Sequence, residues 1–308
     1  MGADVDAAVS ALLRGELAIL PTETVYGLAC DAGDARAVAK VFEAKGRPQF
    51  NPLIAHVTGL EAALAIAALD ARARRLAEAF WPGPLTLVAN ITDTAAVCDL
   101  ARAGLDTVAV RAPDHPAAQA VLAAVGRPIG APSANRSGRP SPTTLADAVE
   151  ETGAFAAAAL DGGACRVGLE STVLASVEGE LVLLRPGAVT REAIERVAGP
   201  LAAGLGEGHR SPGRLARHYA PSKPLRLDVR EPSPGAAYLA FGPEPAGGVS
   251  SFNLSPSGDL AEAAANLFAF LRAADRTDAP VIEAAPIPHR DLGEAINDRL
   301  QRAAGRVG

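Results

Sequence analysis

The sequence lacks both standard phosphate-binding motifs. Neither G-x-x-x-x-G-K-[ST] nor a G-x-G-x-x-G at a strand-to-helix turn occurs in its 308 residues. Such motifs hold phosphates on the backbone N–H groups of a glycine-rich loop. A phosphate site in this chain must therefore be built from dispersed arginine, lysine, serine and threonine side chains, with bidentate guanidinium contacts in place of that loop.

Cysteine, aromatic residues and long apolar runs are scarce as well. The three cysteines, Cys30, Cys98 and Cys165, share no C-x-x-C spacing, so the sequence indicates neither a disulfide framework nor a zinc site. Aromatic residues make up 4% of the chain, so alanine, valine and leucine must fill its cores. The chain has no apolar run long enough to span a membrane and opens on Met1-Gly2-Ala3-Asp4 rather than on a basic segment. These features predict a soluble cytoplasmic protein with no membrane contact.

An excess of positive charge is also missing. The chain has 29 Lys and Arg against 35 Asp and Glu, which gives a formal net charge of −6. This balance argues against a protein whose main task is to coat nucleic acid, although it does not exclude a local basic cleft. At 308 residues, about half of them apolar, the chain exceeds the usual size of one core, so one large and one small domain are expected.

Strands and helices alternate along the first two thirds of the chain, which predicts an α/β fold. Asp34 is placed to cap a helix. The short gap between the last two predicted strands is typical of a hairpin and favours a mixed sheet over a purely parallel one. The predicted strands are residues 17–20, 53–57, 85–89, 107–111, 172–177 and 181–184, and the predicted helices are residues 5–14, 35–44, 71–80, 116–125 and 143–151.

Regular periodicity disappears between residues 204 and 224, where Gly-Leu-Gly-Glu-Gly-His-Arg-Ser-Pro-Gly is typical of a linker. A smaller α/β unit with a three-stranded sheet is expected after it. We therefore predict a first domain at 1–205, a linker at 206–224 and a second domain at 225–308. The second domain has predicted strands at 225–229, 237–241 and 281–285, and predicted helices at 260–274 and 291–304.

A basic segment, Lys45-Gly46-Arg47-Pro48, lies between a predicted helix and a predicted strand. Asn51-Pro52-Leu53-Ile54 follows it, and a threonine-rich turn at residues 21–28 precedes it. Two fixed cations and an amide near such a turn suit a polyanionic nucleotide. The structural alternative is that Lys45 and Arg47 are favourable cations at the C-terminus of a helix, but the following Pro48 and Asn51-Pro52 favour a functional role.

Other polar groups follow predicted strands. Ser133-Ala134-Asn135 comes after an apolar segment and leads into a basic, hydroxyl-rich loop at residues 136–143. Arg111 and Arg185 end two predicted strands. Side chains at strand ends line the ligand crevice of open α/β sheets, so these groups are candidates for one site. Each alone is more often a surface group or a turn residue.

Six ordered segments together resemble the YrdC-domain L-threonylcarbamoyladenylate synthases. The resemblance implies a twisted mixed sheet with flanking helices, followed by a smaller Rossmann-like α/β domain. Residues 211–213, 218–221 and 295–300 are similar to the linker and accessory domain of the long, two-domain form. The six segments are residues 21–28, 45–54, 133–135, 141–143, 171–173 and 184–187.

The resemblance implies a nucleotidyltransferase that joins L-threonine, bicarbonate and ATP into L-threonylcarbamoyl-AMP with release of pyrophosphate. This reaction is the first step of the threonylcarbamoyladenosine modification of tRNA. A carbamate oxygen attacks the α-phosphorus of ATP, so the protein supplies alignment and charge rather than a nucleophile. Magnesium is expected to arrive with ATP, with no metal site on the protein. The implied partners are downstream threonylcarbamoyl transfer proteins, with tRNA involved only indirectly.

The resemblance also assigns residues to the two substrates. Arg111 suits the amino-acid carboxylate because its planar fork binds both oxygens. His56 follows an apolar strand, where a structural histidine with a satisfied hydrogen bond is the ordinary alternative. The implied catalytic residues are Lys45 and Arg47. The implied ATP-binding residues are Lys45, Arg47, Asn51, Thr107, Ser133, Asn135, Ser141, Arg185 and Tyr219. The implied threonine-binding residues are Thr24, His56, Arg111, the backbone at Ala131, and Ser171.

The linker is a candidate lid over the nucleotide, and a passive tether is the alternative. Two departures from the family pattern affect this part of the site. Arg214-Leu215-Ala216-Arg217 stands where the family has Met, Lys and an aromatic residue, and Phe50 is bulkier than expected.

Two other functions are open at this point. The same basic surface could form an RNA-binding module, although the net charge is negative and no aromatic platform lies among the cations. Carbamoyl-phosphate handling is disfavoured because zinc-finger cysteine spacing and an acylphosphatase-like segment are absent from the sequence.

Overall fold

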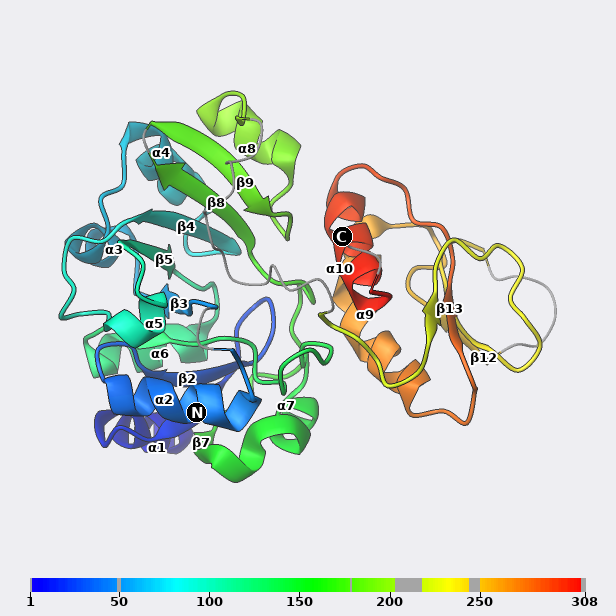
Figure 1. The fold of residues 1–308 in the computed structure, drawn as a ribbon, viewed down its shortest axis with the longest axis horizontal. Helices are drawn as coiled ribbons and strands as arrows, with labels where there is room; N and C mark the ends of the chain where they lie inside the picture. Colours follow the sequence, from blue (N-terminus) through cyan, green and yellow to red (C-terminus); the bar gives the residue numbers. More distant parts are fainter. Residues whose placement is uncertain (1, 49–50, 178, 203–217, 244–249, 306–308) are drawn as a thin grey trace.

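The computed structural model describes residues 2–48, 51–177, 179–202, 218–243 and 250–305. Two sheets organise these residues, a nine-stranded sheet in the first part of the chain and a four-stranded sheet in the last (Figure 1). This arrangement confirms the prediction of an α/β fold with a smaller second domain. Most of the predicted linker lies outside the described residues, so the boundaries at 205/206 and 224/225 stay predictions.

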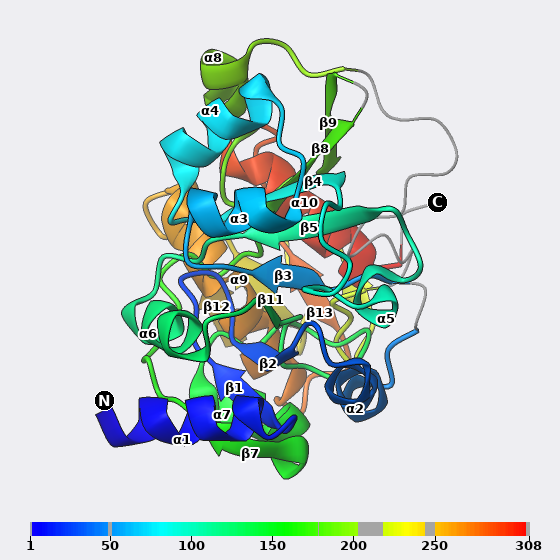
Figure 2. The same ribbon diagram turned by 90° about the vertical axis from the view of Figure 1, so that its left-hand side faces the viewer.

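The large sheet is mixed, as predicted. Its strand order is β7-β1-β2-β6-β3-β5-β4-β8-β9, and Figure 2 shows it running from β9 at the top to β7 at the bottom. Three neighbouring pairs, β1–β7, β3–β5 and β4–β8, are parallel and the others are antiparallel, including the predicted β8–β9 hairpin. The strands are β1 (Leu17–Leu20), β2 (Gly27–Asp31), β3 (Ile54–His56), β4 (Leu85–Asn90), β5 (Thr107–Arg111), β6 (Ile129–Gly130), β7 (Ala156–Ala159), β8 (Thr172–Val177) and β9 (Glu180–Arg185).

Helices cover the large sheet on both faces. The predicted N-cap Asp34 accepts a hydrogen bond from Arg36 N at 2.8 Å and starts α2, as expected. The predicted helix start at residue 143 is wrong by two residues, because Thr144 is the N-cap of α7. The helices are α1 (Gly2–Leu13), α2 (Ala35–Lys45), α3 (Leu60–Ile66), α4 (Ala71–Phe80), α5 (Asp99–Arg102), α6 (Pro116–Val125), α7 (Leu145–Thr152), a short 3₁₀ turn at Gly153–Phe155 and α8 (Arg191–Ala198).

The two faces of the large sheet are packed differently. One face forms a single core with α2, α3, α4 and α8. On the other face, α1 and α6 cover only the part near β1, β2 and β6. The remaining part of that face carries an apolar strip from five strands, which includes Ile54, Val88, Ala109 and Val182. Because side chains alternate along a strand, Thr107 and Arg111 share the face of Ala109 and flank this strip.

The small sheet is parallel throughout, with strand order β10-β13-β11-β12. The sequence predicted three strands and missed β12. Helices α9 and α10 lie between this sheet and the large body (Figure 1). The elements are β10 (Leu225–Arg226), β11 (Ala237–Ala240), β12 (Ser250–Asn253), α9 (Leu260–Asp275), β13 (Ile282–Ala284) and α10 (Leu292–Ala303). No helix among the described residues is long and apolar enough to cross a bilayer.

The two bodies share a hydrophobic core. Val25 and Leu169 of the first body pack in one cluster with Leu267 and Phe268 of α9. Gly168 allows this close approach: its φ is +71°, and a Cβ there would lie 2.5 Å from Ala264 O. The small domain therefore packs directly against the segment that leads into β8.

Candidate active site

A cavity lies beside the apolar strip of the large sheet, which contributes Ile54 to its wall. Nine of the fourteen predicted site residues line it, although they come from distant parts of the chain. The lining residues are Thr24, Val25, Arg47, Pro52, Leu53, Ile54, His56, Arg111, Ala131, Pro132, Ser133, Glu170, Ser171, Arg185, His218 and Tyr219.

At one end of the cavity, Arg111 is paired with an acid. Its Nη2 lies 2.6 Å from Glu23 Oε1, and both side chains are buried. Arg111 Nη1 donates to Thr24 Oγ1 at 2.9 Å, and Nε donates to Gly83 O at 3.2 Å. Burial alone would raise the pKa of Glu23, but the Arg111 charge and the hydrogen bonds to the carboxylate together outweigh it, and the pKa lies below its usual value. This end therefore carries a fixed, neutralised ion pair.

His56 stands next to this ion pair at the end of β3, in register with Arg111 on β5. Its Nδ1 lies 3.2 Å from Ile54 O. Burial lowers the pKa of His56 to about 3, and the nearby Arg111 charge acts in the same direction. The ring is therefore neutral at physiological pH. The structural and functional interpretations of His56 are compatible, because the ring both makes a local hydrogen bond and lines the cavity.

At the other end, two guanidinium groups face the cavity without an acidic partner among the residues that the structure describes. Arg47 donates to Asn51 O at 3.2 Å and to Pro52 O at 3.1 Å. Arg185, at the end of β9, donates to Ser171 O at 2.8 Å. Burial lowers the pKa of Arg47 to about 10, so the group stays charged at neutral pH. This end can therefore hold a polyanion.

Aromatic rings close the cavity at the same end. Tyr219 is fully buried, and its hydroxyl has no hydrogen-bond partner among the described residues. Its φ of +62° is a left-handed conformation that a non-glycine residue seldom adopts, so the surrounding packing must fix it. The His218 ring packs edge-on against it, with centroids 3.9 Å apart. The structure thus brings Tyr219 into the cavity wall, where the sequence predicted it.

Two family models match this chain. One, described as "Telomere recombination", matches residues 10–187, and one described as "Threonylcarbamoyl-AMP synthase, C-terminal domain" matches residues 189–305. The threonylcarbamoyl-AMP synthase of Bacillus subtilis is 39% identical over 97% of this chain and 92% of its own length. That of Pyrococcus abyssi is 40% identical over 95% of this chain and 91% of its own length. The chain belongs to the threonylcarbamoyl-AMP synthase family.

A solved structure extends the likeness to three dimensions. The crystal structure of Pyrococcus abyssi Sua5 complexed with L-threonine superposes with a TM-score of 0.88 at 37% sequence identity. The match covers 98% of this chain and 94% of that chain. Both domains of this family member therefore share the fold of the long, two-domain form, as the sequence resemblance implied.

Five of the predicted site residues do not line the cavity. Lys45 ends α2, and its Nζ donates to the carbonyl oxygens of Ser133 and Asn135. Burial lowers the pKa of Lys45 well below its usual value, and the Arg47 charge adds to this effect. The lysine expected to face phosphates thus holds the backbone of the loop after β6, because those carbonyls surround the buried end of its side chain.

Asn135 and Ser141 also hold this loop rather than face the cavity. Asn135 Nδ2 donates to the carbonyls of Arg136 and Arg139, at 2.8 and 2.9 Å, while its Oδ1 has no partner among the described residues. Ser141 Oγ donates to Glu170 Oε1 at 2.5 Å. We call residues 133–141 the serine loop.

Asn51 and Thr107 lie near the cavity but outside its wall. The backbone carbonyl of Asn51 accepts from Arg47, and its buried Oδ1 has no partner among the described residues. Thr107 is four residues before Arg111 on the same face of β5, or about 13 Å along the strand. The apolar strip lies between Thr107 and the Arg111–Glu23 ion pair, which we call the paired end of the cavity. A ligand can therefore contact Thr107 only if it extends along this strip.

Sequence reasoning missed Glu170, whose carboxylate is in the cavity wall. Burial would raise its pKa, but the charges of Arg299 and Arg185 lower it to about 2. The only local signal was its position directly before Ser171, and Arg299 stood in a family-like segment with no assigned role. Phe50 and Arg214–Arg217, where the sequence departs from the family pattern, lie outside the described residues, as does most of the predicted lid.

Proposed function

We propose that this chain joins L-threonine, bicarbonate and ATP into L-threonylcarbamoyl-AMP with release of pyrophosphate, as the name of its family indicates. One observation carries the proposal: a single cavity has a small polar end built around Arg111 and a cationic end built around Arg47 and Arg185. A small zwitterion and a triphosphate need these two environments side by side.

L-Threonine would occupy the end of the cavity with the ion pair. The Arg111 guanidinium would take the carboxylate, and Thr24 and Ser171 would offer hydroxyl groups. His56 is neutral, so it can hydrogen-bond to the substrate hydroxyl or amine without repelling a protonated ammonium group. The backbone at Ala131 lines the same end. The likeness to a Sua5 structure complexed with L-threonine supports L-threonine as the ligand.

ATP would occupy the cationic end and the adjoining apolar strip. Arg47, Arg185 and the Ser133 hydroxyl would face the phosphates, with Tyr219 closing over them. Leu53 and Ile54 in the cavity wall would offer apolar contact to the nucleoside, with Thr107 beyond the strip that Ile54 begins. In this arrangement Lys45, Asn135 and Ser141 act by holding the serine loop, and Asn51 acts through its contact with Arg47.

The chemical step needs alignment rather than an enzyme nucleophile. The threonine amine attacks the carbon of bicarbonate, which forms a carbamate and releases water. A carbamate oxygen then attacks the α-phosphorus, and pyrophosphate leaves. Holding reactants in line can lower a barrier by about 7–11 kcal/mol, whereas one preorganised donor contributes about 3–4 kcal/mol. Bound substrates that fill the cavity would displace water and so protect the labile carbamate.

Magnesium would enter as part of the ATP complex, as a component of the substrate rather than a resident cofactor. Among the described residues, no three His, Cys, Asp or Glu side chains are grouped so that they could hold a metal ion. The product would pass to threonylcarbamoyl transfer proteins, and tRNA would be involved only indirectly.

The RNA-binding alternative is less consistent with the geometry. Arg185 and Lys45 are buried, and Arg47 is only partly exposed. A polynucleotide backbone binds to cations on an open surface, so these groups suit a small anion that enters the cavity.

A pyrophosphate-release assay tests the proposal. We expect release from ATP that requires both L-threonine and bicarbonate, and that is lost when either is omitted. Arg75→Met, which removes an exposed arginine on α4 far along the sheet, should leave the rate unchanged. Salt-sensitive tRNA binding without threonine-dependent pyrophosphate release would instead favour the RNA-binding module.

A further inference from the structure

Glu170, in the cavity wall, forms its ion pair with an arginine of the small domain. Arg299, on α10, is 1% exposed, and its Nε donates to Glu170 Oε2 at 2.8 Å. The same guanidinium donates from Nη2 to Pro186 O at 3.0 Å, next to Arg185, and lies 5.2 Å from the centre of the Tyr219 ring. A single side chain of the small domain thus contacts Glu170, Tyr219 and the residue that follows Arg185.

Glu170 is the one acidic side chain in the cavity wall that the structure describes, and it lies near the cations proposed for ATP. Its carboxylate is close enough to Arg185 for the two charges to influence each other. Arg299 supplies the direct ion pair instead. Glu170 is thereby neutralised from the side of the small domain, and Arg185 keeps its charge for a ligand in the cavity.

The same carboxylate also holds the serine loop. While Oε2 accepts from Arg299, Oε1 accepts from Ser141 at 2.5 Å. A carboxylate fixed on both oxygens leaves the serine one orientation. The link from α10 to the serine loop therefore passes through Glu170.

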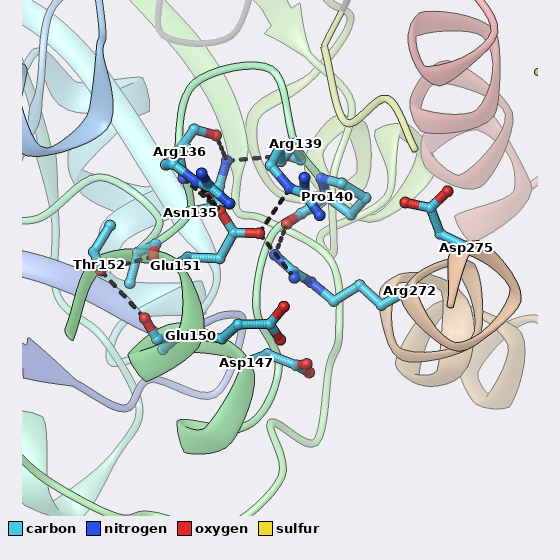
Figure 3. A network of polar contacts seen from close by, with 12 residues as sticks. Asn135, Arg136, Arg139, Pro140, Asp147, Glu150, Glu151, Thr152, Arg272 and Asp275 are labelled. Atoms are coloured by element: carbon cyan, nitrogen blue, oxygen red, sulfur yellow. Dashed lines mark hydrogen bonds and ion pairs between the residues drawn. The ribbon is translucent and has the colours of Figure 1, made fainter. Parts of the chain in front are cut away.

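A second arginine of the small domain reaches the same end of this loop. Figure 3 shows Arg272 of α9 beside Glu151, whose carboxylate also meets Arg139. Arg272 Nη1 lies 3.1 Å from Glu151 Oε1, and its Nη2 donates to Pro140 O. Two buried arginines from the small domain thus converge on residues 139–141.

We propose that Arg299 is a positioning residue of the nucleotide site, which neutralises Glu170 so that Arg185 stays available to the phosphates and Ser141 stays oriented. The proposal rests on the proposed function and gives the small domain a defined part in ATP binding. Without Arg299, the Glu170 carboxylate would turn to Arg185 and compete with the triphosphate. Loss of Arg299 should therefore weaken ATP binding and leave L-threonine binding largely unchanged, because Arg111 has its own acidic partner in Glu23.

Arg299→Met and the double variant Arg299→Met/Glu170→Gln test this role. Calorimetry would measure the dissociation constants of ATP and of L-threonine for the full chain. We expect Arg299→Met to weaken ATP binding at least about tenfold and L-threonine binding less than about twofold. Glutamine keeps an acceptor for Ser141 but carries no charge, so the double variant should recover ATP affinity to within about threefold of the wild type.

The matched control is Arg276→Gln, at the C-cap of α9 and four residues after Arg272. Arg276 Nη2 lies 2.7 Å from Asp147 Oδ1, so it joins the same two bodies without contact to the serine loop or to Glu170. This variant should change neither affinity.

Three results would overturn the proposal. Arg299→Met could weaken ATP binding and L-threonine binding equally, the double variant could fold without recovering ATP affinity, or the control variant could weaken ATP binding. If Arg299→Met alone does not fold, the double variant decides, because a neutral pair must still fold and bind ATP. Absence of threonine-dependent pyrophosphate release in the wild type would defeat the proposed function, whereas the ATP affinities would still report on Arg299.

Discussion

The two ends of the cavity balance charge in opposite ways. At the end proposed for threonine, Arg111 and Glu23 form a buried ion pair that is complete within the first domain. At the end proposed for ATP, Arg47 and Arg185 have no ion-pair partner among the described residues, and Glu170, the one acid in the described cavity wall, is neutralised by Arg299 from the second domain. A net-neutral pocket fits a zwitterion, and an uncompensated cationic pocket fits a polyanion.

This difference predicts separate costs when charge is removed at each end. Loss of a partner from a buried ion pair leaves an isolated buried charge, which mainly lowers stability. Loss of an unpaired cation removes the attraction for an anionic ligand and mainly lowers affinity. Substitutions at the paired end should therefore mainly lower the stability of the fold, and substitutions at the cationic end should mainly lower the affinity for ATP.

The largest expected effect is at the paired end. Glu23→Gln removes the acid beside Arg111 and should lower the free energy of unfolding by about 3–5 kcal/mol, because the guanidinium stays buried without its counter-charge. Denaturant unfolding measures this value. Glu294→Gln, which breaks the exposed ion pair with Arg191, is the control and should cost less than about 1 kcal/mol. Equal losses for the two variants would contradict a special role for the buried pair.

Arg47→Met should give the next largest effect, at the cationic end. We expect the KM for ATP to rise by about 10²-fold, while the free energy of unfolding changes little because no ion pair is lost. Steady-state pyrophosphate release at saturating L-threonine measures the change. The two ends would not be distinct if this variant weakened L-threonine binding as strongly as ATP binding, or destabilised the fold as much as Glu23→Gln.

The fold was largely predictable because its signals are local. Residues 107–111 and 172–177 are β5 and β8, and residues 71–80 and 116–125 are α4 and α6, with the bounds that periodicity gave. Four strands were missed: β2, β6, β7 and β12. The first of them begins within the predicted turn at residues 21–28. β6 has only two residues, and β7 consists of four alanines, a residue that does not favour strands. These two form because neighbouring strands pair with them.

The site was predictable only in part. Arg111 and Arg185 were found because side chains at strand ends point to one edge of a sheet. Glu170 and Arg299 are 129 residues apart, and no pattern in either segment indicates that they meet. Lys45 could not be distinguished from a phosphate ligand by sequence, since its contact with Ser133 and Asn135 carbonyls depends on tertiary packing.

The smallest effect concerns a feature that the two ends share. His56 at the paired end and His218 at the cationic end are both buried, and burial lowers the pKa of each to about 3. The unfolded chain binds a proton on each histidine below about pH 6.5, whereas the folded chain does not do so until near pH 3. Their contribution to stability is therefore complete above pH 6.5 and is lost as the pH falls from 6.5 towards 3.

Below about pH 6.5, each histidine should lower the free energy of unfolding by about 1.4 kcal/mol for each unit that the pH falls. Unfolding free energies between pH 5 and 8 for the wild type, His56→Gln and His218→Gln would measure the slopes. We expect each glutamine variant to flatten the acid slope by the same amount, because burial dominates both pKa values. A flattening by His56→Gln alone would mean that His218 is protonated in the folded protein. The cationic end would then hold one more positive charge than its geometry indicates.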